Sequence, residues 1–319
     1  MPTWESRTWQ GLETLQLRGD TLEVEVLPGY GGQVRSLVYR PAGLELLRTP
    51  KTLDELQGRP FLFGIPVLFL PGRLRGGEFT LGGRTYRWPL NERGVNHLHG
   101  FVWGKPWQST VADGVLTVAF TAARESAEAE AFGHPFRLAI AYRVRGGELS
   151  VRAEVENLDD AAMPLGLGYH TTLSLVDGQG QPLVYTAQLP AGREWEMGSD
   201  VMPTGRLGMP EKFARWVQGG QRLWEVVSDN LFLVDGEAEN AVTMELEQPR
   251  LSVKMTGRDP FRNWVVYRPA LDAPFISIEP VSWVHNAPNL SQPAEFTGVR
   301  LLEGHEHAVF EYLVALSPT

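Results

Sequence analysis

Two histidines lie close together in the segment from Asn91 to Trp107, which reads NERGVNHLHGFVWGKPW. His97 and His99 are separated by one leucine, Gly100 follows His99 directly, and Trp103 stands four residues after His99. Imidazoles titrate near neutral pH, and a glycine lets the backbone and nearby rings approach a ligand closely. The segment therefore suits a pocket for a small polar molecule. Two histidines with structural hydrogen bonds beside core tryptophans would explain the same residues equally well.

Three further polar residues each follow or open an apolar run. Arg73 follows such a run, and its planar fork of donors suits vicinal hydroxyls or a developing oxyanion. His170 follows the glycine-rich run LGLGY, and Asp229 stands at the start of the apolar run Leu231–Leu233. Taken singly, a solvated loop arginine, a buried structural histidine and an Asx turn explain these three residues.

A carboxylate closes the stretch FISIEP. Alternation places Phe275, Ser277 and Glu279 on one face of this strand, and Pro280 ends it. A carboxylate in such a position must be paired, solvated or functional. A partly buried glutamate next to a histidine is a common acid/base pair near neutral pH, and a structural ion pair is the alternative.

The elements that must position these residues are predicted to be strands. Apolar and polar residues alternate with a period of two, separated by glycine- and proline-containing turns, in six stretches: Leu22–Val26, Leu116–Phe120, Phe136–Val144, Leu149–Val155, Leu251–Met255 and Ala308–Val314. Helical signals are limited to Thr52–Gln57 and Glu211–Gln218, the second opened by Pro210. We therefore expect an all-β fold, with residues 1–319 forming one large antiparallel β domain, and not a chain of βα units.

Composition excludes several classes of partner. The net charge of −9 argues against nucleic acid and against an anionic membrane surface. The absence of cysteine excludes disulfides and thiolate metal sites. The most apolar stretch, Phe61 to Leu70, is too short to span a bilayer, and no secretory signal is visible. We expect a cytoplasmic protein, and the sequence says nothing about its oligomeric state.

The order and spacing of these segments resemble the aldose 1-epimerase (galactose mutarotase) family over most of the chain. Residues Arg73 to Gly100 resemble the family pattern that ends in Asn-x-Leu-His-Gly. The run Phe132–Val144 is similar to the family's proline-containing turn into a long strand, and Asp229–Phe232 resembles its Asp-x-x-Phe. The segment Ile278–Pro280, with Asn286–Asn289 after it, is similar to the one that carries the family's glutamate.

The resemblance implies a large antiparallel β super-sandwich of the galactose mutarotase type, with a small sugar bound in an open cleft. It implies that Glu279 is the general base for the anomeric hydroxyl and that His170 is the general acid for the ring oxygen. Arg73 and His99 are then expected to bind the open-chain carbonyl, and Asp229 to hold sugar hydroxyls. No redox step or covalent intermediate is needed, so we expect neither a cofactor nor a metal.

Two side chains of the opening segment receive different expectations. Trp103 is a candidate to stack on the apolar face of a pyranose, because an indole offers a large flat surface. His97 stands at a variable place in the family pattern, so we expect it to be structural.

Alternatives to a free-sugar epimerase remain at this stage. Gly72 stands where the family has an asparagine, which leaves the substrate open. A hexose-6-phosphate 1-epimerase is one alternative, with Arg73 and Arg75 meeting the phosphate. A non-catalytic sugar-binding protein on the same fold is another, although binding alone does not require both His170 and Glu279. A glycosidase is disfavoured, since no second carboxylate is clearly placed to pair with Glu279.

Overall fold

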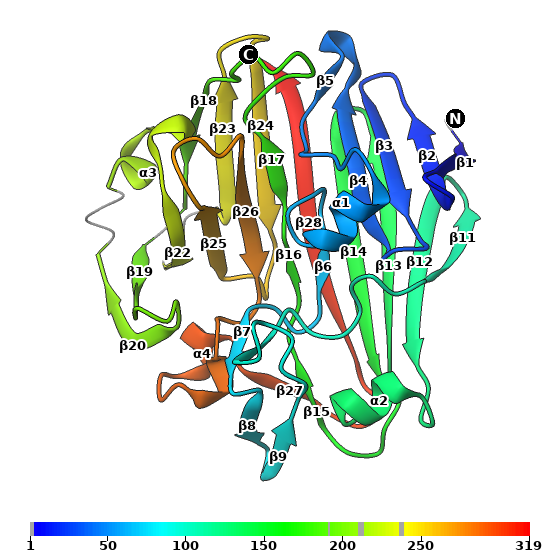
Figure 1. The fold of residues 1–319 in the computed structure, drawn as a ribbon, viewed down its shortest axis with the longest axis vertical. Helices are drawn as coiled ribbons and strands as arrows, with labels where there is room; N and C mark the ends of the chain where they lie inside the picture. Colours follow the sequence, from blue (N-terminus) through cyan, green and yellow to red (C-terminus); the bar gives the residue numbers. More distant parts are fainter. Residues whose placement is uncertain (1–2, 191, 210–213, 236–238) are drawn as a thin grey trace.

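The computed structural model describes residues 3–190, 192–209, 214–235 and 239–319, which form antiparallel β sheets with four short α-helices. One layer is a nine-stranded sheet. A five-stranded and an eight-stranded sheet lie in front of it and are joined by the bridges Val34–Ile65 and Leu47–Leu173 (Figure 1). The expected all-β sandwich is confirmed.

The nine-stranded sheet contains the long strands of the molecule. Its order is β11 (Gln108–Ala112), β12 (Val115–Ala122), β13 (Phe136–Arg145), β14 (Glu148–Asn157), β28 (His307–Pro318), β24 (Leu251–Gly257), β23 (Ala241–Leu246), β18 (Tyr185–Gln188) and β21 (Gln221–Arg222). In β13 the side chains of Phe136, Leu138, Ile140 and Tyr142 are all buried, as the alternation predicts. Five of the six predicted strands lie in this sheet, and all five are confirmed.

The eight-stranded sheet carries most of the polar residues of interest. It contains β20 (Pro203–Gly208), β19 (Arg193–Met197), β22 (Ser228–Leu233), β25 (Asn263–Arg268), β26 (Phe275–Val281), β16 (Gly168–Tyr169) and β6 (Val67–Leu68), and β17 (Thr172–Ser174) pairs with β26. All seven residues of β26 are buried, because the strand has neighbours on both sides and the nine-stranded sheet behind it. Glu279 therefore lies in the interior of the fold.

The remaining strands form smaller sheets. The five-stranded sheet consists of β1 (Trp4–Trp9), β2 (Leu12–Arg18), β3 (Leu22–Leu27), β4 (Gln33–Tyr39) and β5 (Leu44–Glu45). Three two-stranded sheets pair β7 (Arg73–Arg75) with β10 (Asn96–Leu98), β8 (Glu78–Leu81) with β9 (Arg84–Arg87), and β15 (Met163–Leu165) with β27 (Arg300–Leu302). The strand predicted at Leu22–Val26 is confirmed as β3.

The described part of the chain has four α-helices: α1 (Leu53–Gly58), α2 (Ala127–Phe132), α3 (Ala214–Gln218) and α4 (Ala294–Thr297). The turn predicted at Thr52–Gln57 is confirmed as α1, and the Thr52 hydroxyl accepts a hydrogen bond from the Glu55 amide at 3.1 Å. The helix predicted at Glu211–Gln218 is present as α3, whereas residues 210–213 lie outside the described residues. The helices α2 and α4 were not predicted from the sequence.

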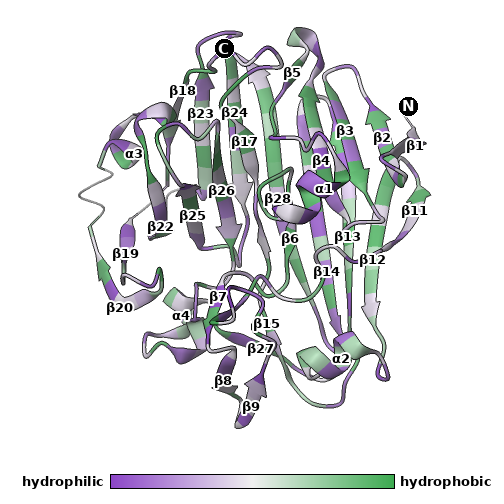
Figure 2. Cartoon of the chain, in the orientation of Figure 1, coloured by the Kyte–Doolittle hydropathy of each residue, from purple (hydrophilic) through white to green (hydrophobic). Residues whose placement is uncertain are grey.

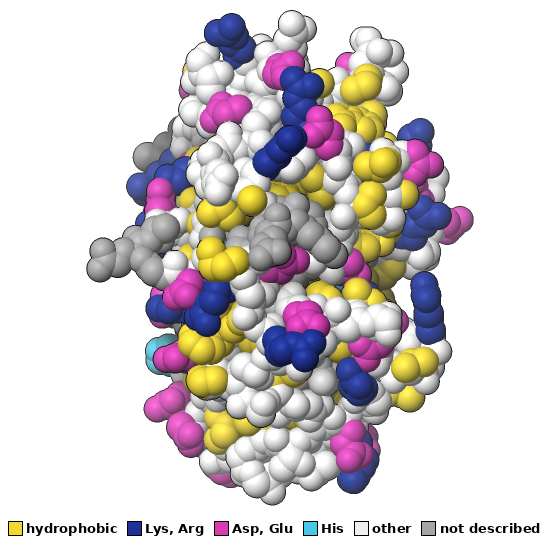
Figure 3. Space-filling view, turned by 90° about the vertical axis from the view of Figure 1, so that its left-hand side faces the viewer, with side chains coloured by type: hydrophobic (Ala, Val, Ile, Leu, Met, Phe, Trp, Pro, Cys, Tyr) yellow, Lys and Arg dark blue, Asp and Glu magenta, His cyan; other side chains and the backbone are white. Residues whose placement is uncertain are grey.

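Polarity follows this layering. Green and purple segments alternate along the strands of both layers, as expected for strands with one buried face (Figure 2). On the face that Figure 3 presents, basic and acidic side chains are interspersed and form no basic stripe. No helix among the described residues has the length and apolar character needed to cross a membrane.

Candidate active site

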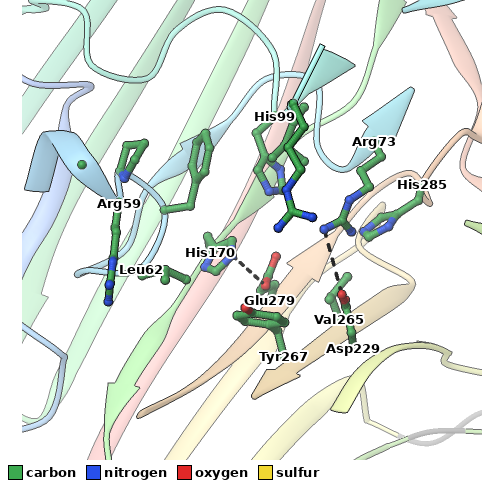
Figure 4. Close-up of a pocket in the computed structure, with 15 residues that line it drawn as sticks. Arg59, Leu62, Arg73, His99, His170, Asp229, Val265, Tyr267, Glu279 and His285 are labelled. Carbon is green, nitrogen blue, oxygen red and sulfur yellow. Dashed lines mark ion pairs between the residues drawn. The ribbon is translucent and has the colours of Figure 1, made fainter. Parts of the chain in front are cut away.

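A cavity of about 400 Å³ opens where the eight-stranded sheet meets the segments around α1, β7 and β10 (Figure 4). Its volume is in the range of cavities that bind small molecules. Five of the six predicted site residues line it: Arg73, His99, His170, Asp229 and Glu279. They come from distant parts of the chain, so the fold brings them together.

Glu279 and His170 form a buried pair at the base of the cavity. His170 Nε2 lies 3.1 Å from Glu279 Oε1, and the two residues are only 5% and 2% exposed. Backbone hydrogen bonds fix both main chains: the His170 amide donates to the Pro66 carbonyl at 3.0 Å, and the Ile278 amide donates to the Thr171 carbonyl at 2.9 Å. The distance between acid and base is therefore set by the sheet.

The second nitrogen of His170 is held by a hydroxyl. Its Nδ1 lies 3.3 Å from Thr172 Oγ1, which also lies 2.9 Å from Ser277 Oγ. All three side chains are buried. The hydroxyl contact orients the imidazole ring so that Nε2 faces Glu279.

Burial opposes charge on both members of the pair. It raises the pKa of Glu279 well above its ordinary value; the nearby Asp229 acts in the same direction, and the Arg73 guanidinium opposes it. Burial also lowers the pKa of His170 below the usual histidine range, and Arg73 lowers it further. Burial therefore favours the neutral form of each group, the carboxylic acid of Glu279 and the neutral imidazole of His170.

Arg73, the first residue of β7, is anchored by two carboxylates. Its Nε donates to Glu92 Oε1 at 2.9 Å, and its Nη2 lies 3.9 Å from Asp229 Oδ2. Glu92 is itself held by the Asn96 side-chain amide at 2.9 Å. Burial raises the pKa of the Asp229 carboxyl, and the Arg73 guanidinium works against this rise. The guanidinium is thus oriented before any ligand arrives, with Glu279 close to it (Figure 4).

His99 is a neutral hydrogen-bond donor. The Gly72 amide donates to its Nδ1 at 3.2 Å, which leaves the ring proton on Nε2. Burial, with smaller effects of His170 and Arg73, lowers the pKa of His99 well below its usual value. Gly100 follows with φ +73°, and a Cβ there would lie 1.7 Å from the Phe69 carbonyl oxygen. The glycine after this histidine is therefore a requirement of packing.

The structure does not bring Trp103 to the cavity. Its ring packs edge-on against Phe61 with centroids 5.1 Å apart, and its Nε1 donates to the Gly100 carbonyl at 3.2 Å. Phe61 lines the cavity and stands in front of it. The expected stacking role of Trp103 is therefore wrong. His97 is buried outside the cavity, and its Nδ1 lies 2.8 Å from the Pro89 carbonyl oxygen, a contact that fits a structural role.

Arg75 also lies away from the cavity. Its exposed guanidinium is 2.6 Å from Asp200, so its expected contact with a phosphate is not supported. Sequence reasoning missed the five other polar or aromatic side chains that line the cavity: Arg59, Phe61, Arg93, Tyr267 and His285. Of these, His285 carried the clearest signal, since it directly precedes the motif Asn286–Asn289. Among the described residues, no three His, Asp or Glu side chains are grouped to hold a metal ion.

Comparison with known proteins gives the family. A model of the aldose 1-epimerase family matches residues 13–310. The chain belongs to the aldose 1-epimerase family. Among curated family members, it is 29% identical over 211 residues to galactose mutarotase of Mus musculus, an alignment that covers 63% of this chain and 58% of the mouse protein. It is 28% identical over 207 residues to galactose mutarotase of Bos taurus, covering 61% and 57%. These alignments span less than two thirds of either relative.

Solved structures of the family share the fold over the whole chain. A galactose mutarotase-like protein from Clostridium acetobutylicum superimposes with a TM-score of 0.91 at 22% identity, covering 99% of this chain and 98% of that one. An aldose epimerase homologue from C. elegans superimposes with a TM-score of 0.77 at 15% identity, covering 100% of each chain. At these identities the likeness establishes the fold of this aldose epimerase family member, and its site must be argued from its own residues.

Proposed function

We propose that the protein is an aldose 1-epimerase that interconverts the α and β anomers of an aldohexose, with Glu279 as the base and His170 as the acid. The observation that carries the proposal is the 3.1 Å contact between these two side chains in the wall of a small cavity, beside Arg73. Membership of the aldose 1-epimerase family supports an isomerase. We expect the reaction to take place in the cytoplasm.

The reaction moves two protons and breaks one bond. The Glu279 carboxylate takes the proton of the anomeric hydroxyl, the bond between C1 and the ring oxygen breaks, and the anomeric oxygen becomes a carbonyl oxygen. Protonated His170 gives its proton to the departing ring oxygen. After rotation about the bond between C1 and C2, the reverse transfers close the ring as the other anomer. No proton is gained or lost overall.

The cycle needs one proton, which His170 and Glu279 share. The reactive form carries it on the His170 imidazole, opposite the Glu279 carboxylate. Moving it across the 3.1 Å contact leaves the net charge of the cavity unchanged. The Arg73 guanidinium, which lowers the pKa of Glu279, favours the carboxylate that results. A buried pair can therefore start the reaction without exchanging a proton with solvent.

The other lining residues supply binding. Arg73 and the neutral Nε2–H of His99 are hydrogen-bond donors for the carbonyl oxygen that develops at C1. Asp229 offers a carboxyl group to sugar hydroxyls. Phe61 and Tyr267 present the aromatic surface that the sequence had assigned to a tryptophan.

Polarimetry tests the proposal. Freshly dissolved α-glucose and α-galactose are followed with and without protein, and beside the Glu279→Gln and His170→Asn variants. We expect the wild type to accelerate the approach to rotational equilibrium and both variants to lose that effect. If calorimetry shows that a sugar binds and polarimetry shows no acceleration, the protein is a sugar-binding protein on the same fold and not an enzyme.

A second candidate substrate is an aldohexose with an anionic group. Arg59 and Arg93 line the cavity at exposed positions, and within the described residues neither forms an ion pair. An arginine without an acidic partner is suited to a phosphate or another anion. Hexose 6-phosphates therefore belong in the same assay, and Arg59→Ala would raise KM for these alone.

A further inference from the structure

His285 lines the cavity but has no part in the proton transfers described above. It is 4% exposed and lies between β26 and a 3₁₀ turn at Ala287–Asn289. Hydrogen bonds to the chain around β7 fix its neighbours: Trp283 Nε1 donates to the Pro71 carbonyl at 2.7 Å, and the Asn286 amide donates to the Arg73 carbonyl at 2.6 Å. The backbone on both sides of the imidazole is therefore clamped to the cavity wall.

The imidazole occupies space that only a glycine at position 72 leaves free. Gly72 has φ +78°, and a Cβ built on it would lie 2.6 Å from Cδ2 and 3.2 Å from Cα of His285. A side chain at position 72 would thus exclude the ring from its present place. The asparagine expected here from the family pattern is absent, and a histidine from a distant segment stands next to Arg73 instead.

The ring is neutral and has an unused hydrogen-bonding atom. Burial lowers the pKa of His285 to about 3; the Arg73 guanidinium acts in the same direction, and the Val201 carbonyl opposes it. Nδ1 is buried and has no hydrogen-bond partner among the described residues. A neutral imidazole has one donor and one acceptor nitrogen, and a hydroxyl group can serve either.

A comparison within the chain separates this residue from the structural histidines. His134 is equally buried, but both of its nitrogens are bonded, Nδ1 to Asp159 at 2.9 Å and Nε2 to the Tyr86 hydroxyl at 2.9 Å. His97 has an unpartnered nitrogen but does not line the cavity. Among the described histidines, only His285 combines a cavity position with an unused nitrogen and no role in proton transfer.

We propose that His285 contacts the bound sugar and selects among aldohexoses by hydrogen-bonding one of their hydroxyl groups. Figure 4 shows the ring beside the Arg73 guanidinium, on the side away from His170. The hydroxyl that it contacts is therefore remote from the ring oxygen, and the contact is made alike in the ground state and the transition state. This inference rests on the proposed function, because it requires a sugar in the same cavity.

The test compares three substitutions on a panel of sugars. His285→Phe fills the space without a polar atom, His285→Asn keeps a polar atom near the position of Nδ1, and His285→Gln keeps one near Nε2. The panel contains glucose, galactose and their monodeoxy analogues. Mutarotation gives kcat and KM, and calorimetry gives the affinity of each sugar without turnover.

In the wild type, we expect one monodeoxy analogue to show a kcat/KM at least about tenfold below its parent, mainly through KM. In the phenylalanine variant this difference should fall to about twofold or less, and the asparagine or glutamine variant should restore it. An equal loss for parents and all analogues in the phenylalanine variant overturns the proposal and leaves His285 a structural residue.

The calorimetric readings separate this proposal from the proposed function. If the wild type binds sugars but accelerates the mutarotation of none, the epimerase activity is refuted. The role of His285 is still supported in that case if the affinity difference between a parent sugar and its monodeoxy analogue disappears in the phenylalanine variant. If the wild type binds no sugar of the panel, both proposals are refuted.

Discussion

Replacing Glu279 by glutamine removes the proposed base and changes little else. The amide cannot take up the proton of the anomeric hydroxyl. General base catalysis contributes about 10²–10⁴-fold, which corresponds to roughly 2.7–5.4 kcal/mol in the activation free energy. We therefore expect kcat to fall by at least about 100-fold, with the residual rate supplied by Arg73, His99 and His170.

The free energy of unfolding should change little in this variant. Glu279 is 2% exposed, and burial favours the neutral form of its carboxyl group, which a neutral amide resembles in size and shape. The amide can still donate to His170 Nε2 across the present 3.1 Å contact. We expect a loss of less than about 1 kcal/mol, whereas Glu279→Ala would leave the imidazole nitrogen unpaired at a cost of about 1–3 kcal/mol.

Polarimetry gives the rate and urea denaturation gives the free energy of unfolding. Glu45→Gln is the matched control, because burial also raises the pKa of Glu45, which accepts hydrogen bonds from the Leu37 and Leu47 amides and does not line the cavity. Its kcat should stay within about twofold of the wild type. A Glu279→Gln variant with more than about a third of wild-type kcat would remove Glu279 as the base. An equal loss in Glu45→Gln would assign the effect to the fold.

Three further outcomes are expected. In the profile of kcat/KM against pH, the acid limb should lie below the usual histidine pKa and the alkaline limb above the usual glutamate pKa, because burial shifts the two groups in these directions. An acid limb centred near 6.5 would contradict the buried pair. Arg73→Ala should lower kcat by about 10²–10³-fold, whereas Arg75→Ala, whose guanidinium pairs with Asp200 outside the cavity, should stay within about twofold, as polarimetry would measure. Arg268→Met should lower the free energy of unfolding, measured by urea denaturation, by about 3 kcal/mol or more without changing kcat. The reason is that the buried guanidinium donates to five carbonyl groups, those of Leu223, Trp224, Val226, Leu271 and Ala273.

The strands could be predicted because their signal is local. Alternation in Phe136–Val144 reports which side chains face the core, and β13 buries those residues. The same reasoning placed Glu279 on one face of its strand with Ser277. The order of strands in each sheet could not be predicted in this way. Strand β14 pairs with β28, more than 150 residues later in the chain, and the sequence of neither strand indicates its partner.

Site residues could be predicted when they belong to or border a strand, but not when a loop between strands determines their position. Trp103 lies close to His99 in the sequence, but the turn at Gly100 carries it behind Phe61, and no periodic pattern describes such a turn. His285 is the opposite case, because it lines the cavity although the sequence did not assign it to the site. Its position depends on hydrogen bonds to a segment 212 residues away and on the missing side chain of Gly72, and neither is visible from its own neighbours.

Two separate sets of contacts position the residues that line this cavity. The distance between His170 and Glu279 depends on backbone hydrogen bonds between neighbouring strands of one sheet, such as that from the Ile278 amide to the Thr171 carbonyl. The place of His285 depends on the ties of its neighbours to the chain around β7. Because the second set does not pass through the first, changes at position 285 should alter which sugar binds and leave the proton transfers intact. Variants at position 285 should therefore change the KM differences between sugars far more than kcat.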